Sequence, residues 1–128
     1  MTKQSDRFGR DNRCFDKIKI KDKSGVDPMK DEWEKNMRED WDHEKVFVKY
    51  RMTSDEYFAN HTEKYDIIFI DGLHENEQVY RDIQNSLKVL NPNGSIIMHD
   101  CLPEKEEHQI VPRQSNYWNG DVWKAFVR

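Results

Sequence analysis

The feature that most constrains this chain is a short apolar run that ends in an acid and a glycine. Ile67 to Ile70 are four consecutive apolar residues, and Asp71 and Gly72 follow them directly. Such a run predicts a fully buried strand over residues 66–70. In an open α/β sheet, ligands bind at the carboxyl ends of the strands. We therefore expect the polar residues after this strand to form part of a site.

The segments that follow this strand alternate between helix and strand. A helix is predicted over 75–90, residues 91–94 have turn chemistry, and a second buried strand is predicted over 95–98. Strands that alternate with helices indicate an α/β fold with a parallel sheet and right-handed crossovers. On the helix, the predicted buried stripe is Val79, Ile83, Leu87 and Leu90, and the predicted solvent face is Arg81, Asp82, Gln84 and Lys88.

Further elements are predicted on both sides of this region. A helix is expected over 29–41 and a short strand over 46–50; a second helix, capped by Thr53 or Ser54, runs to about Asn60. A last helix is expected over 120–127, after a segment, 101–116, that has no clear period. The faces expected to be apolar are Trp33, Met37 and Trp41 on the first helix, and Val122, Trp123 and Phe126 on the last.

The composition narrows the class of protein. A chain of 128 residues predicts one domain, and a charged content of 36% against 35% hydrophobic residues predicts a small core. No apolar stretch is long enough for a membrane span or a signal peptide, so we expect a cytoplasmic protein without membrane contact.

Residues 1–24 are basic, but acids are interleaved and only Phe8 and Phe15 could stack on bases, so we expect no nucleic-acid partner. Cys14 and Cys101 are expected to be reduced thiols.

Three acids follow predicted strand ends, and two histidines accompany them. The acids are Asp27, Asp71 and Asp100, and the histidines are His74 and His99. Because parallel strands share one carboxyl edge, these side chains can converge on one crevice. Carboxylates with imidazoles suit a divalent ion such as Mg²⁺, Mn²⁺ or Fe²⁺ better than structural zinc, and a histidine can act as a general base. The sequence contains no serine-hydrolase elbow, P-loop or dinucleotide-binding glycine motif.

Each of these residues also has a purely structural alternative. Asp27 could cap the helix that follows it, Asp71 could stabilise the turn at Gly72, and His99 with Asp100 could begin a polar loop. His74 could cap a helix or lie in solvent. The remaining histidines, His43, His61 and His108, have no such context and are expected at the surface.

Several motifs together resemble the class I S-adenosylmethionine-dependent methyltransferases, in their small-molecule and sugar O-methyltransferase branch. They are Gly25–Pro28, Ile70–His74, Gln78–Ile83, Leu90–Gly94, Met98–Cys101 and Gly120–Ala125. The resemblance implies a three-layer, mostly parallel Rossmann-like sheet over 9–128, preceded by a polar N-terminal arm over 1–8. It also implies methyl transfer from S-adenosylmethionine to a small-molecule acceptor, such as a sugar hydroxyl.

The resemblance also assigns roles to individual residues. Gly9 corresponds to the glycine-rich cofactor loop, Asp27 to the acid that binds the ribose hydroxyls, Thr53 and Ser54 to the loop near the adenine, and Asp71 to the methionine end of the cofactor. In metal-dependent relatives the acids that end the fourth and fifth strands bind Mg²⁺. Those positions are Asp71, His99 and Asp100 here, and His74 and His99 are the candidate catalytic bases.

The chain departs from the family at four places. Residues 4–8 are polar where the first strand is expected, Arg13 replaces a glycine, Leu73 replaces an acid, and the chain ends soon after Ala125. The sheet is therefore expected to be incomplete, with truncation at both ends and an exposed edge that favours pairing of two copies. Two alternatives follow: a non-catalytic remnant of the fold that acts in binding or assembly, and an iron oxygenase that uses both histidines and one acid.

Overall fold

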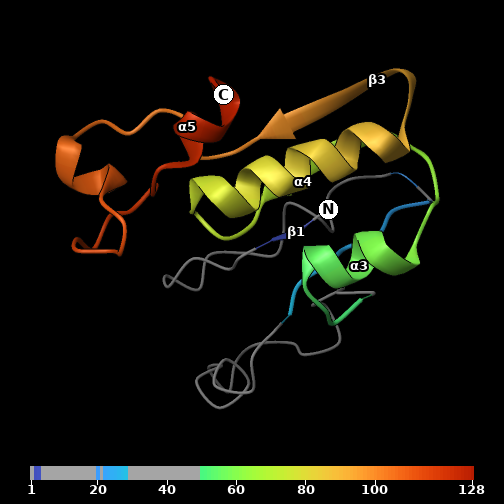
Figure 1. Cartoon of the computed structure of the whole chain (residues 1–128), viewed down its shortest axis with the longest axis horizontal. Helices are drawn as coiled ribbons and strands as arrows, with labels where there is room; N and C mark the ends of the chain where they lie inside the picture. Colours follow the sequence, from blue (N-terminus) through green and yellow to red (C-terminus); the bar gives the residue numbers. More distant parts are fainter. Residues whose placement is uncertain (1, 4–19, 21, 29–49) are drawn as a thin grey trace.

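The computed structural model describes residues 2–3, 20, 22–28 and 50–128 (Figure 1). The predicted helix over 29–41, most of the predicted strand over 46–50, and the predicted cofactor residue Gly9 lie outside the described residues. At the end of that strand, Tyr50 forms an isolated parallel bridge with Val26.

The centre of the fold is a parallel sheet of three strands within the described residues. The strands are β1 (Thr2–Lys3), β2 (Tyr65–Asp71) and β3 (Leu90–Met98), in the order β1-β2-β3. Both pairings are parallel, which confirms the predicted α/β class and corresponds to part of a Rossmann-like fold. Two residues of the polar arm form β1, in which Thr2 pairs with Ile70.

The pairing of β2 with β3 places their carboxyl ends side by side. The register runs from Ile67 opposite Ser95 to Ile70 opposite Met98. The predicted turn at 91–94 lies within the first part of β3, where the register shifts and Asn93 adopts a φ of 65°. Asparagine tolerates this left-handed conformation better than most residues do. The regular pairing therefore begins after the turn, close to the predicted strand start.

The helix predicted after residue 53 is confirmed as α3 (Ser54–Asn60), and a local capping box explains where it begins. The Thr53 hydroxyl accepts the Glu56 N–H at 3.2 Å, and the Glu56 carboxylate accepts the Thr53 N–H at 2.8 Å. Two N–H groups at the helix start are thereby satisfied by residues three apart in sequence. Such a signal is readable without tertiary structure.

The long helix is confirmed as α4 (Asn76–Val89), but its buried face differs from the predicted one. Asp82, predicted to face water, is 1% exposed, and Leu87, predicted to be buried, is 55% exposed. The buried positions are spaced by three, four and three residues, whereas the predicted stripe began with two steps of four. Each step of four advances about 40° around the helix, so the predicted stripe turned away from the packed face. The buried residues are Val79, Asp82, Ser86 and Val89.

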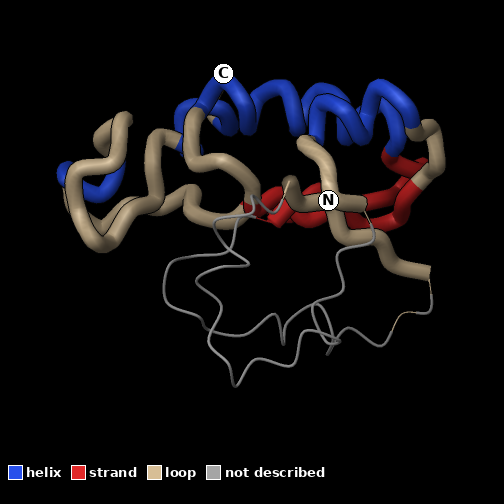
Figure 2. Tube along the Cα trace, turned by 90° about the horizontal axis from the view of Figure 1, so that it is seen from below, coloured by secondary structure: helices blue, strands red, loops and turns tan. Residues whose placement is uncertain are grey.

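The helices cover one face of the sheet, and the prediction of a fully buried β2 is wrong. Figure 2 shows α4 and the neighbouring α5 (Val122–Phe126) on the same side of the strands. Ile68 and Ile70 are buried on this side, whereas Ile67, which alternates with them, is 54% exposed. The core cluster consists of Ile68, Ile70, Val79, Val89, Val122 and Ala125.

The last helix is shorter than predicted, and one of its apolar assignments is wrong. Val122 and Ala125 of α5 are buried against the core, whereas Phe126 is largely exposed. The segment 101–116, which has no helical or strand periodicity in its sequence, contains the short 3-10 helix η2 (Glu106–Gln109). None of the helices in the described part of the chain is long and apolar enough to cross a membrane.

Candidate functional site

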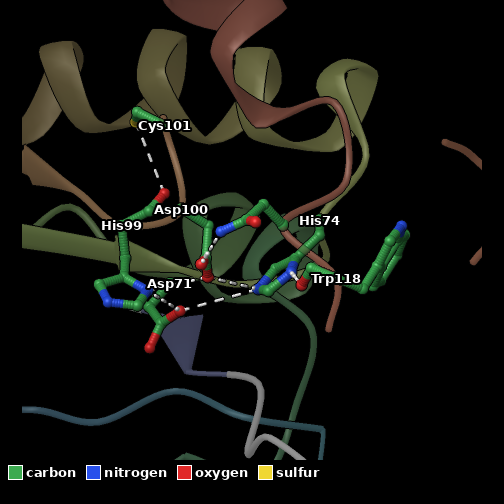
Figure 3. Close-up of polar contacts among 7 residues, drawn as sticks. Asp71, His74, His99, Asp100, Cys101 and Trp118 are labelled. Atoms are coloured by element: carbon green, nitrogen blue, oxygen red, sulfur yellow. Dashed lines mark hydrogen bonds and ion pairs between the residues drawn. The ribbon is translucent and has the colours of Figure 1, made fainter. Parts of the chain in front are cut away.

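Four polar side chains meet where β2 and β3 end (Figure 3). Asp71 is the last residue of β2, and His99 and Asp100 follow β3 directly. The His99 N–H donates to the Ile70 carbonyl at 3.0 Å, so the pairing of the two strands continues into the site. His74 comes from the loop between β2 and α4. Four of the five side chains predicted to converge therefore meet here, and the parallel register of β2 and β3 brings Asp71 to His99 and Asp100.

His74 lies at the centre of this cluster, in an orientation that its Nδ1 atom determines. Nδ1 lies 3.1 Å from the Trp118 carbonyl, which can only accept, so Nδ1 carries a hydrogen. The opposite atom, Nε2, lies 3.0 Å from Asp100 Oδ2 and 3.9 Å from Asp71 Oδ1. The ring also packs on Trp118, with 5.2 Å between the ring centroids. His74 therefore presents Nε2 to both carboxylates.

Asp100 turns back toward the other residues through an unusual backbone conformation. Its φ is 59°, in the left-handed region that aspartate adopts more readily than most residues. Its Oδ1 accepts a hydrogen bond from Asn119 Nδ2 at 2.7 Å, and its Oδ2 faces His99 Nδ1 at 2.8 Å and His74 Nε2 at 3.0 Å. Both carboxylate oxygens thus have partners, and backbone conformations as rare as that of Asp100 are found preferentially at functional sites.

Hydrogen bonds and charges within the cluster stabilise the protonated form of His74 and the ionised form of Asp100. Burial alone would lower the pKa of His74, but hydrogen bonds to Asp100 and Asp71 outweigh it and raise the pKa to about 9. Burial raises the pKa of Asp100, but the hydrogen bonds and charges of His74 and His99 lower it below its usual range. Without a metal, His74 is therefore an imidazolium at neutral pH, and an imidazolium cannot serve as a general base.

The cluster also has the donor set of a metal site. One ligand atom each from Asp71, His74 and Asp100 lies within 4.8 Å of the others, and all three residues are partly buried. His99 lies beside this group and is more open to solvent, with a side chain 59% exposed. Two carboxylates and an imidazole are suitable ligands for a divalent cation. The residues present therefore fit a metal ion.

The segment 118–121 contributes to the site, although no individual residue in it was assigned a role from the sequence. Trp118 and Asn119 contact His74 and Asp100. Gly120 has a φ of +65°, and a Cβ built on it would lie 1.8 Å from the His74 carbonyl oxygen, so only glycine fits. The buried Asp121 carboxylate accepts the Asn76 N–H at 2.7 Å. The Asn119-Gly120 pair was a readable turn signal, although nothing local showed which residues it would contact.

The other predicted cofactor residues lie on separate elements. Asp27 follows the Val26–Tyr50 bridge, and its N–H donates to the Tyr50 carbonyl at 3.1 Å, so this acid lies at the end of a short parallel pairing. The Thr53 hydroxyl belongs to the capping box, and the buried Ser54 hydroxyl accepts a hydrogen bond from Gln78 at 3.1 Å. The hydroxyls of Thr53 and Ser54 thus hold α3 in place.

The expectation that His108 lies at the surface is wrong, because this residue is only 6% exposed. Its carbonyl accepts the N–H groups of Asn119 and Gly120 at 2.9 and 3.0 Å, so its backbone supports the segment 118–121. His61 is half-buried and stacks on Tyr57, with 4.3 Å between the ring centroids. Cys101 is a free thiol, as predicted. His43 and Cys14 lie outside the described residues.

Comparisons with known proteins identify the family. Residues 10–101 match a family described as a methyltransferase domain. The matched region contains β2, α4 and β3 and ends directly after Asp100. No curated protein and no solved structure matches the chain. Because the matched region spans well over half of the residues, this chain belongs to the methyltransferase domain family.

Proposed function

We propose that this protein is an S-adenosylmethionine-dependent methyltransferase whose acceptor is a hydroxyl group of a small molecule, such as a sugar. The observation that carries the proposal is the cluster of Asp71, His74, His99 and Asp100 at the carboxyl ends of β2 and β3. In open α/β sheets this edge is the binding site. A member of a methyltransferase family that gathers acids and imidazoles there has groups for binding and for proton transfer.

The proposed cofactor site includes residues at the ends of two parallel pairings, the Val26–Tyr50 bridge and the pair of β2 with β3. S-adenosylmethionine, when bound, supplies the methyl group that is transferred. Asp27, at the end of the Val26–Tyr50 bridge, suits a pair of ribose hydroxyls, because a carboxylate can accept both hydrogen bonds. Asp71 is proposed to lie beside the methionine end, Thr53 and Ser54 near the adenine, and Gly9 in the loop that approaches the cofactor.

His99 is the residue we propose as the general base. Its Nδ1–H donates to Asp100 Oδ2 at 2.8 Å, which leaves the Nε2 lone pair of the neutral ring as an acceptor. His74 is less suited to this task, because the two carboxylates hold it in its protonated form. His99 would take the proton of the acceptor hydroxyl, and Asp100 would stabilise the imidazolium that forms.

A divalent metal, for which Mg²⁺ is the ion that the resemblance implies, would assist by orienting the acceptor. Asp71 and Asp100 are the oxygen ligands that this proposal requires, and both line the cluster. Positioning contributes strongly to a displacement reaction between two bound molecules. The enzyme holds both reactants in the reactive geometry, so they need not meet by diffusion in the correct orientation. The protein's own part is therefore to hold the acceptor and to remove its proton.

The test is cofactor binding by the folded protein. We expect S-adenosylhomocysteine to raise the melting temperature, with a stabilisation of about 2.7 kcal/mol when its concentration is about a hundredfold above its dissociation constant. Isothermal titration calorimetry would measure the affinity directly, with and without Mg²⁺. Asp27→Ala should weaken binding at least about tenfold, because about 1.4 kcal/mol is lost with a charge-assisted hydrogen bond.

The matched control is Asp22→Ala, which removes an exposed acid from the same segment and should leave the affinity unchanged. A cooperative unfolding transition that does not move with S-adenosylhomocysteine would contradict the proposal. That outcome would favour a folded, non-catalytic relative that acts in binding or assembly.

A further inference from the structure

His74 lies between the two carboxylates, in the position of a metal ligand. The hydrogen bond from Nδ1 to the Trp118 carbonyl fixes the ring and assigns its hydrogen to Nδ1. Histidines that bind metals through Nε2 are typically held in this way, with the other nitrogen bonded to a carbonyl or carboxylate. The lone pair of Nε2 is then available to an ion that replaces the proton between His74 and Asp100.

The spacing of the donor atoms agrees with a shared ion. Ligand atoms that bind one ion at about 2.1 Å lie about 3 Å apart at right angles and somewhat further apart in a tetrahedral arrangement. His74 Nε2 lies 3.0 Å from Asp100 Oδ2 and 3.9 Å from Asp71 Oδ1. The first distance matches a shared ion as it stands, whereas Asp71 would have to move closer to His74 when a cation binds.

We propose that Asp71, His74 and Asp100 bind a first-row transition-metal dication in preference to Mg²⁺. This inference rests on the proposed function, in which a metal orients the acceptor. Its nitrogen ligand is His74, whereas the family resemblance implied His99. Mg²⁺ prefers oxygen ligands and keeps much of its water shell, whereas imidazole suits the transition metals. His99, on the solvent side, then remains free for proton transfer.

Asn119 is the positioning residue of this metal site. Its side-chain amide donates to Asp100 Oδ1 at 2.7 Å, which turns Oδ2 toward His74. The neighbouring Trp118 carbonyl orients His74, so one short segment holds two of the three ligands. Loss of an outer partner of this kind typically costs about 10- to 100-fold in metal affinity.

The test uses Co²⁺ as the probe, because its visible absorption bands report the ligands and Mg²⁺ is spectroscopically silent. We expect the metal-free full chain to bind one Co²⁺, and an excess of Mg²⁺ of about a hundredfold should not displace it. His74→Asn should weaken Co²⁺ at least about tenfold and change the bands, and Asn119→Ala should weaken it by about 10-fold or more. The control is His61→Asn, which changes the residue directly after α3, outside the cluster, and should bind Co²⁺ as the unsubstituted protein does.

Each of three results would overturn the inference: no stoichiometric Co²⁺ binding, displacement of Co²⁺ by the excess of Mg²⁺ of about a hundredfold, or unchanged affinity in a folded His74→Asn variant. The Mg²⁺ competition uses the unsubstituted protein, so it is decisive even if a variant does not fold. Binding of S-adenosylhomocysteine is measured separately. If that binding persists while Co²⁺ fails to bind, the metal inference alone is wrong.

Discussion

At the scale of single residues, the site depends on how His74 and Asp100 are oriented. The Nδ1 atom of His74 is held by a backbone carbonyl, and both oxygens of Asp100 have partners. Two neighbouring histidines consequently differ in environment: His74 is enclosed by carboxylates, and His99 is exposed. This difference is the reason that we propose metal binding for the first and proton transfer for the second.

The raised pKa of His74 predicts how stability depends on pH in the absence of metal. The pKa is about 9 in the folded protein, whereas an unperturbed histidine side chain, as in the unfolded chain, has a pKa of 6.5. Protonated His74 thus stabilises the fold fully below pH 6.5, and this stabilisation is lost as the pH rises toward 9. We expect the free energy of unfolding to fall by up to about 3 kcal/mol over this range.

Urea unfolding at several pH values in the presence of a chelator would measure this dependence. In His74→Asn the titrating group is gone, so the variant should lose less stability over the same pH range. Parallel curves for the two proteins would show that His74 does not carry the effect.

At the scale of secondary-structure elements, the start of α4 depends on a residue far along the chain. Glu75 occupies the N-cap position but makes no side-chain cap hydrogen bond. The buried carboxylate of Asp121 accepts the Asn76 N–H at 2.7 Å and the Asn76 side-chain amide at 3.2 Å. The Asp121 N–H in turn contacts the His74 carbonyl at 3.3 Å. The helix start and the site are therefore held by the same segment.

Asp121→Ala should therefore destabilise the protein by about 1–2 kcal/mol, because a partly buried helix N–H loses its cap. Glu75→Ala is the matched control: it removes an acid from the nominal cap position and should change stability by less than about 0.5 kcal/mol. Chemical denaturation of both variants would compare them. Equal effects would mean that Asp121 does not cap α4.

At the scale of the whole molecule, the sheet has two unequal faces. Within the described residues, α4 and α5 cover the face that carries Ile68 and Ile70. Ile67 and Ile97 lie on the other face and are about half exposed. The free energy gained from the sheet should therefore come mainly from the helix-covered side.

Alanine substitutions at two adjacent isoleucines would test this asymmetry. Ile68→Ala removes a buried side chain from the core and should cost about 2–5 kcal/mol. Ile67→Ala makes the same chemical change on the same strand and should cost less than about 1 kcal/mol, because the side chain is half exposed. Thermal or urea unfolding would measure both. Similar costs would mean that the second face is packed as tightly as the first.

The amino-acid sequence by itself determined β2, α3 and α4 and the meeting of the ends of β2 and β3. The run that ends at Asp71 indicated β2, the candidate cap at Thr53 or Ser54 located the start of α3, and the helical pattern located α4, because these signals are local. Convergence of Asp71 with Asp100 also followed, since parallel strands have a common carboxyl edge.

Only the tertiary structure decided which side chains pack and how the site is oriented. Burial of Asp82 and exposure of Leu87 depend on how α4 meets α3, α5 and the sheet, which a helical period alone does not specify. His74 owes its orientation to Trp118, 44 residues later, and Asp100 owes its own to Asn119, 19 residues later. Contacts between residues so distant in sequence form only when the whole chain packs, so no local pattern could reveal them.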